Sequence, residues 1–374
     1  MLGGDKGGRI VKNKCLALVL SGGGGRGAAH LGIIKALYER GIKPDIYIGS
    51  SIGAIISAMM AVYDNVDLAI EKYLDFARKY GWFNLVDFPI FPQKGIKSMG
   101  GLIDGQRLIN VITEEAGLSG KKLSQTRKPL YIISTDLNSG DEIVFGFPQK
   151  LKTHKKDHYQ PLFYPKDILI AKALRASIGL PVLFKPYPRN IGQRKLALLD
   201  GGIRDNCPIT LAAYLPDVKY IFASILSFAG QQNIDYFRKD IASVFFEFLE
   251  IATSYSQVGK SCDSALFTTK PAPAVRIVNP GLFSISPLAL NKSEIMIGSA
   301  YQTMQSILDK FDDPRQFWQR WDKAKIIEFH APRWQAERLG QARADIVSIT
   351  DQRSPVEREL KKKSFKAKLA KLFK

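Results

Sequence analysis

Apolar runs and helical periodicity alternate along the first sixty residues of the chain. Residues 15–20 (CLALVL) are uninterrupted apolar residues, which is typical of a parallel strand buried on both faces. After a glycine-rich turn, apolar residues recur at helical spacing from Ala28 until Gly41. A short strand is predicted at 46–48 and a strongly apolar helix at 52–63. This order predicts a parallel α/β sheet.

Similar segments continue to about residue 226 and complete one predicted α/β core. The further strands expected are 129–136, 142–147, 195–199 and 218–226, with a helix near 166–177. The segments 81–105 and 146–166 are rich in loop-forming, aromatic or basic residues and are interpreted as surface insertions. Residues 233–310 show two helical patterns around a short strand at 273–278.

Composition indicates a folded globular chain with excess positive charge. Hydrophobic residues make up 45% of the 374 residues and charged residues 24%, which excludes a disordered or fibrous chain. Lys and Arg number 54 against 35 Asp and Glu, so the formal net charge is +19. This excess favours anionic surfaces such as acidic lipid or nucleic acid. No nucleic-acid-binding motif accompanies it, so nucleic acid is not an expected partner.

Cysteine usage and the absence of long apolar stretches indicate the compartment. Cys15, Cys207 and Cys262 have neither CxxC nor metal-ligand spacing, so no disulfide framework and no metal site is expected. The N-terminus is polar and no run approaches 18 apolar residues, which predicts neither a signal peptide nor a membrane span. We expect a cytoplasmic protein, compatible with peripheral attachment to a membrane.

Three glycine-containing motifs form the candidate site. They are Gly22–Gly27, Gly49–Gly53 and Asp200–Gly202. Ser51 falls where a predicted strand turns into a predicted helix, and Gly49 and Gly53 on its two sides let the backbone make a sharp turn. This context predicts a nucleophile elbow at a helix N-terminus, which favours developing negative charge. A helix N-cap serine is the alternative.

The glycine run suits oxyanion binding. An oxyanion needs preorganised N–H donors near the reacting carbonyl, and glycine allows that approach; the candidate donors are Gly23, Gly24 and Gly25. Arg26 has three possible roles: orienting the loop, meeting a phosphate, or capping a carbonyl at the surface. The run also fits a dinucleotide fingerprint with Asp45 as the acid, so an NAD(P)-binding oxidoreductase is an alternative function. Asp45 lies at the start of the predicted second strand, however, whereas the ribose-binding acid of a dinucleotide site lies at the end of that strand.

A serine nucleophile needs a base, and the chain has four histidines. His30 lies in the first predicted helix and is expected to be packed there, while His154 and His158 belong to a lysine-rich loop. His330 would complete a Ser, Asp, His order with the serine of the elbow and the aspartate of the triplet.

Asp200 is the preferred base. It follows an apolar strand, and Gly201 and Gly202 after it allow close approach to another backbone. An aspartate in a turn is the alternative interpretation.

Taken together, these motifs resemble those of a bacterial-type patatin-like phospholipase. The family's G-G-G-x-R-G is matched by Gly22–Gly27, its G-x-S-x-G by Gly49–Gly53 and its D-G-G by Asp200–Gly202. The longer motifs that also agree are Thr135–Gly140, Ala173–Phe184 and the pair Asn206 and Pro208. Ser21 departs from plant members, which carry Asp before the glycines.

The resemblance implies a three-layer α/β/α fold with a mostly parallel central sheet and a C-terminal helical extension. It also implies a Ser-Asp dyad that needs no cofactor or metal, in which Ser51 attacks an acyl ester of a phospholipid or lysophospholipid and Asp200 accepts the proton. The amides of Gly23–Gly25 would hold the oxyanion, supported by Arg26 and the flanking glycines. The other alternative is a catalytically silent lipid-binding protein, against which Ser51 and Asp200 both argue.

The resemblance and the composition divide the chain into three parts. Residues 14–226 are expected to form a patatin-like catalytic domain and 227–350 a mainly helical completion of the core or a lid region. Residues 351–374 are expected to be a basic amphipathic tail, with apolar residues along one helix face and a net charge of 8 − 2 = +6 over 355–374. An anionic membrane surface is the expected partner of the tail; a solvated or docked tail is the alternative.

Overall fold

The structure is a computed structural model of the chain. It describes residues 15–80, 101–147, 150–152, 159–165, 167–226, 273–282, 285, 288–311, 326–329 and 346–348. Several predicted features lie outside these residues: most of the segment 81–105, the loop residues with His154 and His158, the first helical pattern of 233–310, Cys262, His330 and the tail 351–374.

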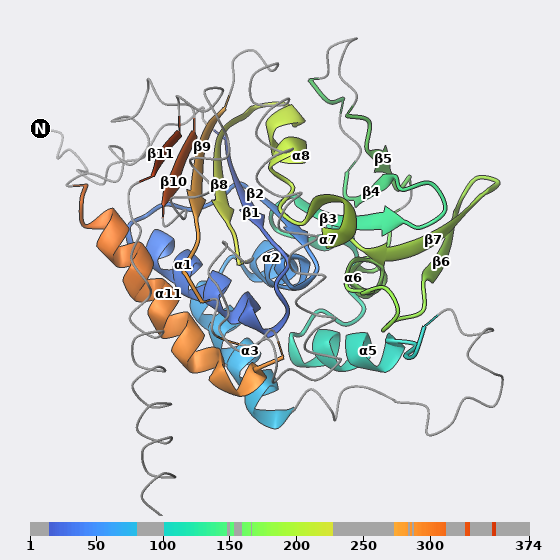
Figure 1. Cartoon of the computed structure of the whole chain (residues 1–374), viewed down its shortest axis with the longest axis horizontal. Coiled ribbons are helices and arrows are strands. Elements are labelled where there is room, and N and C mark those ends of the chain that lie inside the picture. Colours follow the sequence, from blue (N-terminus) through green and yellow to red (C-terminus); the bar gives the residue numbers. More distant parts are fainter. Residues whose placement is uncertain are drawn as a thin grey trace, which may run out of the picture.

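A mostly parallel sheet forms the middle of the fold (Figure 1). Its strands in the described residues are β1 (Cys15–Leu20), β2 (Ile46–Ser50), β3 (Leu130–Asp136), β4 (Glu142–Phe145), β5 (Leu162–Phe163), β6 (Tyr187–Ile191), β7 (Arg194–Asp200), β8 (Val218–Ser224), β9 (Ala274–Val278), β10 (Ile326–Phe329) and β11 (Ile346–Ser348). The order is β11-β10-β9-β8-β1-β2-β3-β4-β5, and β7 pairs with both β3 and β6. Neighbours from β11 to β3 are parallel, whereas β3 is antiparallel to β4 and β7.

Helices cover both faces of the sheet. The α-helices in the described residues are α1 (Ala28–Glu39), α2 (Ile52–Tyr63), α3 (Val66–Lys79), α5 (Gln106–Glu115), α6 (Ile170–Ser177), α7 (Gly202–Asp205), α8 (Ile209–Tyr214) and α11 (Ser293–Leu308). The short 3₁₀ helices are η1 (Gly24–Gly27), η3 (Leu123–Gln125) and η5 (Leu290–Lys292). None of these helices combines the length and the apolar character that a membrane span needs.

The side chains of β1 alternate between two apolar clusters. Leu16, Leu18 and Leu20 pack in a cluster with α1, α2, α3, α5, α6 and α11, while Ala17 and Val19 pack in a cluster with α8. Because successive strand residues point to opposite faces, the two clusters lie on opposite sides of the sheet. The fold is therefore the expected three-layer α/β/α arrangement.

The first two strands and the first two α-helices confirm the prediction from the apolar pattern, since β1, α1, β2 and α2 lie at the expected residues. The strands β3, β4, β7, β8 and β9 also coincide with predicted strands, to within a few residues. The helix predicted at 166–177 begins only at Ile170, because Leu169 forms an antiparallel bridge with Lys122. No element is predicted where α3, α5, α7, α8, β5, β6, β10 and β11 lie.

The end of the segment 81–105 is buried, so interpreting it as a surface insertion was wrong there. Ile103 is buried and pairs in parallel with Phe184. A Cβ on Gly101 would lie 2.5 Å from the backbone nitrogen of Lys185. Glycine in this segment therefore permits a close approach between two backbones.

The sheet and its helical layer continue beyond residue 226. The strands β9, β10 and β11 extend the sheet, and α11 runs alongside α1 (Figure 1). A Cβ on Gly32 of α1 would lie 2.1 Å from the carbonyl oxygen of Ile297, so the two helices cross closely. Arg40 forms an ion pair with Asp309 at the end of α11. The division of the chain into three parts stays a prediction.

Candidate active site

The turn between β2 and α2 holds Ser51 in a strained conformation. Its φ of 52° and ψ of −127° are unusual for a residue with a side chain. A Cβ on Gly49 would lie 2.4 Å from the carbonyl of Gly53, and a Cβ on Gly53 would lie 2.2 Å from the carbonyl oxygen of Leu20. The turn thus requires glycine on both sides of Ser51, as a nucleophile elbow does.

Asp200 ends β7 and faces the elbow. The hydroxyl of Ser51 donates a hydrogen bond to Oδ2 of Asp200 at 2.7 Å. The amide of Gly202 donates to the other carboxyl oxygen at 2.8 Å. The antiparallel pairing of Asp200 with Ser134 of β3 brings the end of β7 to the carboxyl edge of the parallel strands. Serine and aspartate, 149 residues apart, are therefore in direct contact.

Burial raises the pKa, and therefore the basicity, of the Asp200 carboxyl. Asp200 is only 2% exposed, and this burial raises its pKa to about 6, opposed by the hydrogen bonds from Ser51 and Gly202. At neutral pH the carboxylate is ionised, and its basicity is higher than that of an exposed aspartate. It can accept a proton from Ser51.

The glycine run lies against Ser51 at the end of β1. A Cβ on Gly22 would lie 3.1 Å from the Cβ of Ser51, and the Gly22 amide donates to Oδ1 of Asn206 at 2.9 Å. Within the described residues, the amides of Gly23, Gly24 and Gly25 donate no hydrogen bond. Three N–H groups without a hydrogen-bond acceptor among the described residues therefore belong to the loop next to Ser51.

Arg26 is inside the protein and not at the surface. It is 4% exposed, and its Nε donates to the carbonyl oxygen of Ile285 at 2.5 Å. The guanidinium thus caps a carbonyl, as one interpretation of the sequence has it, but in a buried position. The contact ties the glycine loop to a segment 259 residues away.

Two polar residues that the motifs contain, but that were not predicted as site residues, form hydrogen bonds with Ser51 and Asp200. Oγ of Ser177 accepts the Ser51 amide at 3.0 Å. Oγ1 of Thr135 donates to the carbonyl oxygen of Asp200 at 2.9 Å. Both residues belong to the longer motifs that agree with the resemblance, which is the signal that marks them.

Two other carboxyls are buried near this edge of the sheet. Glu142 on β4 is the cross-strand partner of Thr135, and it accepts a hydrogen bond from the Tyr159 hydroxyl at 2.6 Å. Asp205 lies on α7, which follows Asp200. Burial raises the pKa of both Glu142 and Asp205, which favours their neutral forms. A neutral carboxyl adds no repulsion to the charge on Asp200.

His30 is a packed residue, as predicted. Its ring is fully buried, with Nδ1 2.7 Å from Oγ of Ser224 and Nε2 2.9 Å from the carbonyl oxygen of Ser21. Burial lowers its pKa to about 4, so the ring is neutral. His154, His158 and His330 lie outside the described residues.

The geometry weighs against the dinucleotide alternative. Asp45 precedes β2, and its carboxylate accepts the amide of Leu16 near the start of β1. The glycine run follows the carboxyl end of β1, whereas Asp45 lies beside its amino end. Asp45 and the run are therefore at opposite ends of the strands. In the described part of the chain, no group of three His, Cys, Asp or Glu side chains is suited to hold a metal ion.

Comparisons with known proteins relate this chain to one family. The family model described as patatin-like phospholipase matches residues 18–213. An uncharacterised NTE family protein of Mycobacterium tuberculosis is 30% identical over 201 residues, which cover 54% of this chain and 28% of that protein. Lysophospholipase NTE1 of Kluyveromyces lactis is 27% identical over 216 residues, which cover 54% of this chain and 12% of that protein. This chain therefore matches less than a third of the length of either relative.

Among solved structures, VipD from Legionella pneumophila is similar with a TM-score of 0.37 and 14% identity, covering 89% of this chain and 74% of that chain.

Proposed function

We propose that this chain, which belongs to the patatin-like phospholipase family, hydrolyses acyl esters of phospholipids or lysophospholipids through a Ser-Asp dyad. The observation that carries the proposal is the 2.7 Å hydrogen bond from the Ser51 hydroxyl to the buried Asp200 carboxylate. A relative whose name is lysophospholipase supports lysophospholipids as one substrate class.

The reaction proceeds in two halves. Asp200 accepts the hydroxyl proton while Oγ of Ser51 bonds to the acyl carbon, and the carbonyl electrons move onto the oxygen. The amides of Gly23, Gly24 and Gly25 stabilise this oxyanion. As the intermediate collapses, Asp200 returns the proton to the leaving alcohol. Water then attacks the acyl-enzyme with Asp200 again as base, which releases the fatty acid and restores Ser51.

Labelling by a fluorophosphonate probe, together with hydrolysis of phosphatidylcholine and lysophosphatidylcholine, tests the proposal. Ser51→Ala is expected to abolish labelling and to lower hydrolysis by roughly 10⁴-fold or more, because the nucleophile is lost. Ser57→Ala is the matched control, since Ser57 is a buried serine on the same helix. It should be labelled like the wild type.

Two outcomes would contradict the proposal. Labelling that persists in Ser51→Ala would remove this serine as the nucleophile. Loss of activity in a folded His330→Ala variant equal to the loss in Asp200→Asn would replace the dyad by a Ser, Asp, His triad.

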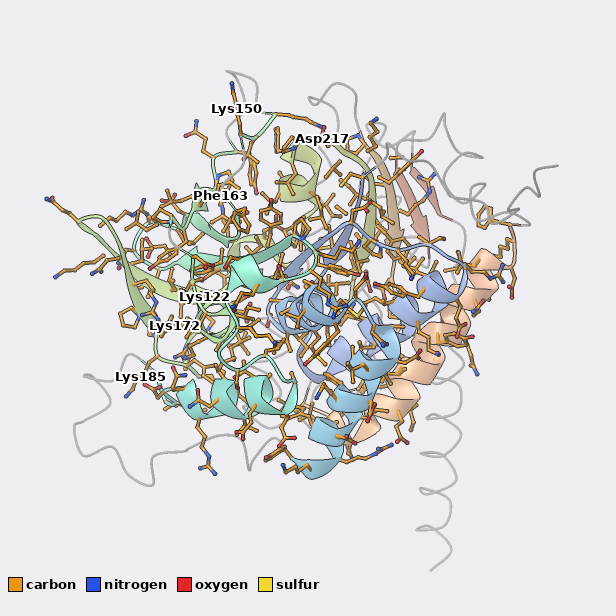
Figure 2. The ribbon with its side chains drawn as sticks, turned by 180° about the vertical axis from the view of Figure 1, so that it is seen from behind. Lys122, Lys150, Phe163, Lys172, Lys185 and Asp217 are labelled. Atoms are coloured by element: carbon orange, nitrogen blue, oxygen red, sulfur yellow. The ribbon has the colours of Figure 1, made fainter. Side chains whose placement is uncertain are left out.

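The second part of the proposal concerns the surface at which the substrate lies. We infer that an anionic membrane attracts the enzyme, because the chain carries a net charge of +19, of which the tail contributes +6. Exposed lysines also belong to the folded part: Figure 2 shows Lys122, Lys172 and Lys185 on the same side of the view.

A further inference from the structure

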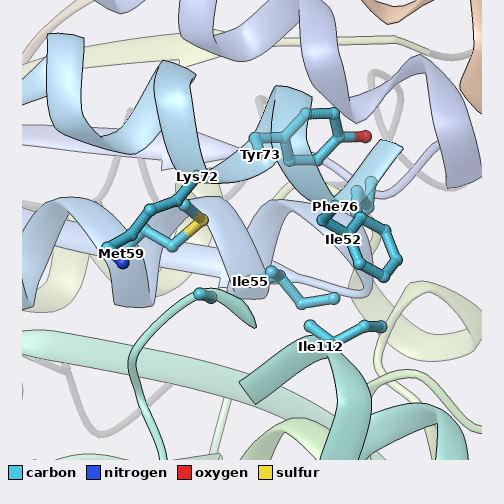
Figure 3. Close-up of a pocket in the computed structure, with 8 residues that line it drawn as sticks. Ile52, Ile55, Met59, Lys72, Tyr73, Phe76 and Ile112 are labelled. Carbon is cyan, nitrogen blue, oxygen red and sulfur yellow. The ribbon is translucent and has the colours of Figure 1, made fainter. Parts of the chain in front are cut away.

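A narrow apolar pocket lies between α2, α3 and α5. Its lining includes Ile52, Ile55 and Met59 from α2, Phe76 from α3, and Ile112 from α5. Figure 3 shows Ile52 and Phe76 at one end of this pocket and Met59 with Lys72 at the other. The surface that faces the pocket is almost entirely hydrocarbon, so it suits an apolar ligand.

One end of the pocket is lined by Ile52, the residue next to the proposed nucleophile. Ile52 follows Ser51 directly, and it also contacts the glycine loop, since a Cβ on Gly27 would lie 2.1 Å from Cγ1 of Ile52. Ile52, Ile55 and Met59 are spaced three and four residues apart, so they share one face of α2. From Ile52 to Met59 this face runs about 10 Å away from the serine.

We propose that this pocket binds the acyl chain of the substrate and that Met59 sets the length it accepts. The inference rests on the proposed function, because it assumes that the carbonyl carbon sits at Ser51 with its oxygen toward the glycine loop. From that point the acyl chain would follow the face of α2 past Ile52 and Ile55 and would meet Met59.

The far end of the pocket is suited to a limit on chain length. The space already open is small, with a volume of about 20 Å³, so an acyl chain must displace side chains to enter. Met59, which is buried, and Lys72 occupy this far end of the pocket (Figure 3). A chain that reaches Met59 then stops against its side chain.

The test compares two neighbouring methionines. Met59 and Met60 are both buried on α2, but Met60 does not line the pocket. We would measure kcat/KM for p-nitrophenyl esters with acyl chains of 4 to 16 carbons in wild type, Met59→Ala and Met60→Ala. Met59→Ala makes room for about two methylenes, so the preference for long over short chains should rise roughly tenfold. Met60→Ala should leave the preference unchanged.

Equal profiles for the two variants would overturn the pocket inference while leaving the proposed function intact. If Met59→Ala is unfolded at the assay temperature, Ile112→Ala replaces it, with the buried non-lining Ile109→Ala of the same helix as control.

Binding of free fatty acids gives a readout that does not need turnover. In the Ser51→Ala background, calorimetric titration with the same chain lengths should show tighter binding of long chains after Met59→Ala and not after Met60→Ala. Absence of hydrolysis and of probe labelling in the wild type would refute the proposed function. The pocket inference would then stand or fall on whether this difference in binding is present.

Discussion

Burial and hydrogen bonding act on the Asp200 carboxyl in opposite directions. Burial disfavours the charged form, while the Ser51 hydroxyl and the Gly202 amide stabilise it, and burial prevails, so the pKa rises to about 6. An aspartate in the unfolded chain has a pKa near 4. Ionised Asp200 therefore costs folding free energy that a neutral side chain would not.

The pH dependence of the reaction follows from this pKa. Asp200 must be ionised to accept a proton, so kcat/KM should fall as pH decreases through about 6 and reach a plateau above it. A pH–rate profile on a soluble ester checks this. An unchanged rate between pH 5 and 8 would exclude Asp200 as the base.

Asp200 lowers the stability of the folded protein at neutral pH, although the proposed reaction needs it. The contribution of Asp200 to stability is present below pH 4 and is lost as pH rises through the folded pKa of about 6. Asp200→Asn should therefore be nearly inactive but more stable than wild type at pH 8, by up to about 3 kcal/mol. Urea unfolding at pH 4 and pH 8 measures the difference, which should vanish at pH 4.

Ser51 and Asp200 could be proposed as a pair from the sequence because their neighbours carry the information. Glycine on both sides marks the serine, and an apolar strand followed by two glycines marks the aspartate. The buried setting of Arg26 could not be predicted, since Ile285 is 259 residues away. The contact between Ser177 and the Ser51 amide could not be predicted either, because the two residues are 126 positions apart in the sequence.

At the scale of elements, the turn from β2 to α2 depends on two backbones that nearly touch. The carbonyl of Leu20 on β1 occupies the space where Gly53 would carry a side chain. Backbone atoms cannot move aside without disturbing the central sheet. The elbow therefore tolerates no methyl group at this position.

Gly53→Ala should destabilise the protein by at least about 2 kcal/mol, because the added Cβ overlaps the Leu20 carbonyl. Gly298→Ala on α11 is the control, since a Cβ there meets nothing within 4 Å. It should stabilise by about 0.5 to 1 kcal/mol, as alanine favours a helix. Thermal unfolding compares the two variants with the wild type. A Gly53→Ala variant as stable as the wild type would contradict the close packing at this turn.

The elements that sequence reasoning missed differ in the strength of their signals. The N-terminus of α3 carries a sequence signal, because Asn65 is an N-cap residue whose side chain accepts a hydrogen bond from the Leu68 amide. The strand β6 has none: it contains Pro188, and its residues alternate only between half-buried and exposed. Its place is fixed by pairing with β7 across a turn at Gly192, whose φ is 58°.

At the scale of the whole molecule, the positive charge is shared between the folded part and the tail. If the tail supplies a membrane anchor, a chain ending at Ser354 should sediment less with acidic vesicles than the full chain. At about 1 kcal/mol per basic residue before screening, the loss should be large at low salt and small at high salt. Equal sedimentation of both chains would exclude a role for the tail, and binding indifferent to salt would exclude the electrostatic mechanism.

The position of β1 in the middle of the sheet has a consequence for synthesis. One neighbour, β2, follows within 50 residues, but the other, β8, pairs with β1 through residues about 200 positions later. A ribosome needs roughly 7 to 30 s to travel from Ser51 to Asp200. Every nascent chain that ends before Asp200 carries the proposed nucleophile without the proposed base. The proposed dyad is therefore complete only after more than half of the polypeptide has been made, which delays its activity during synthesis.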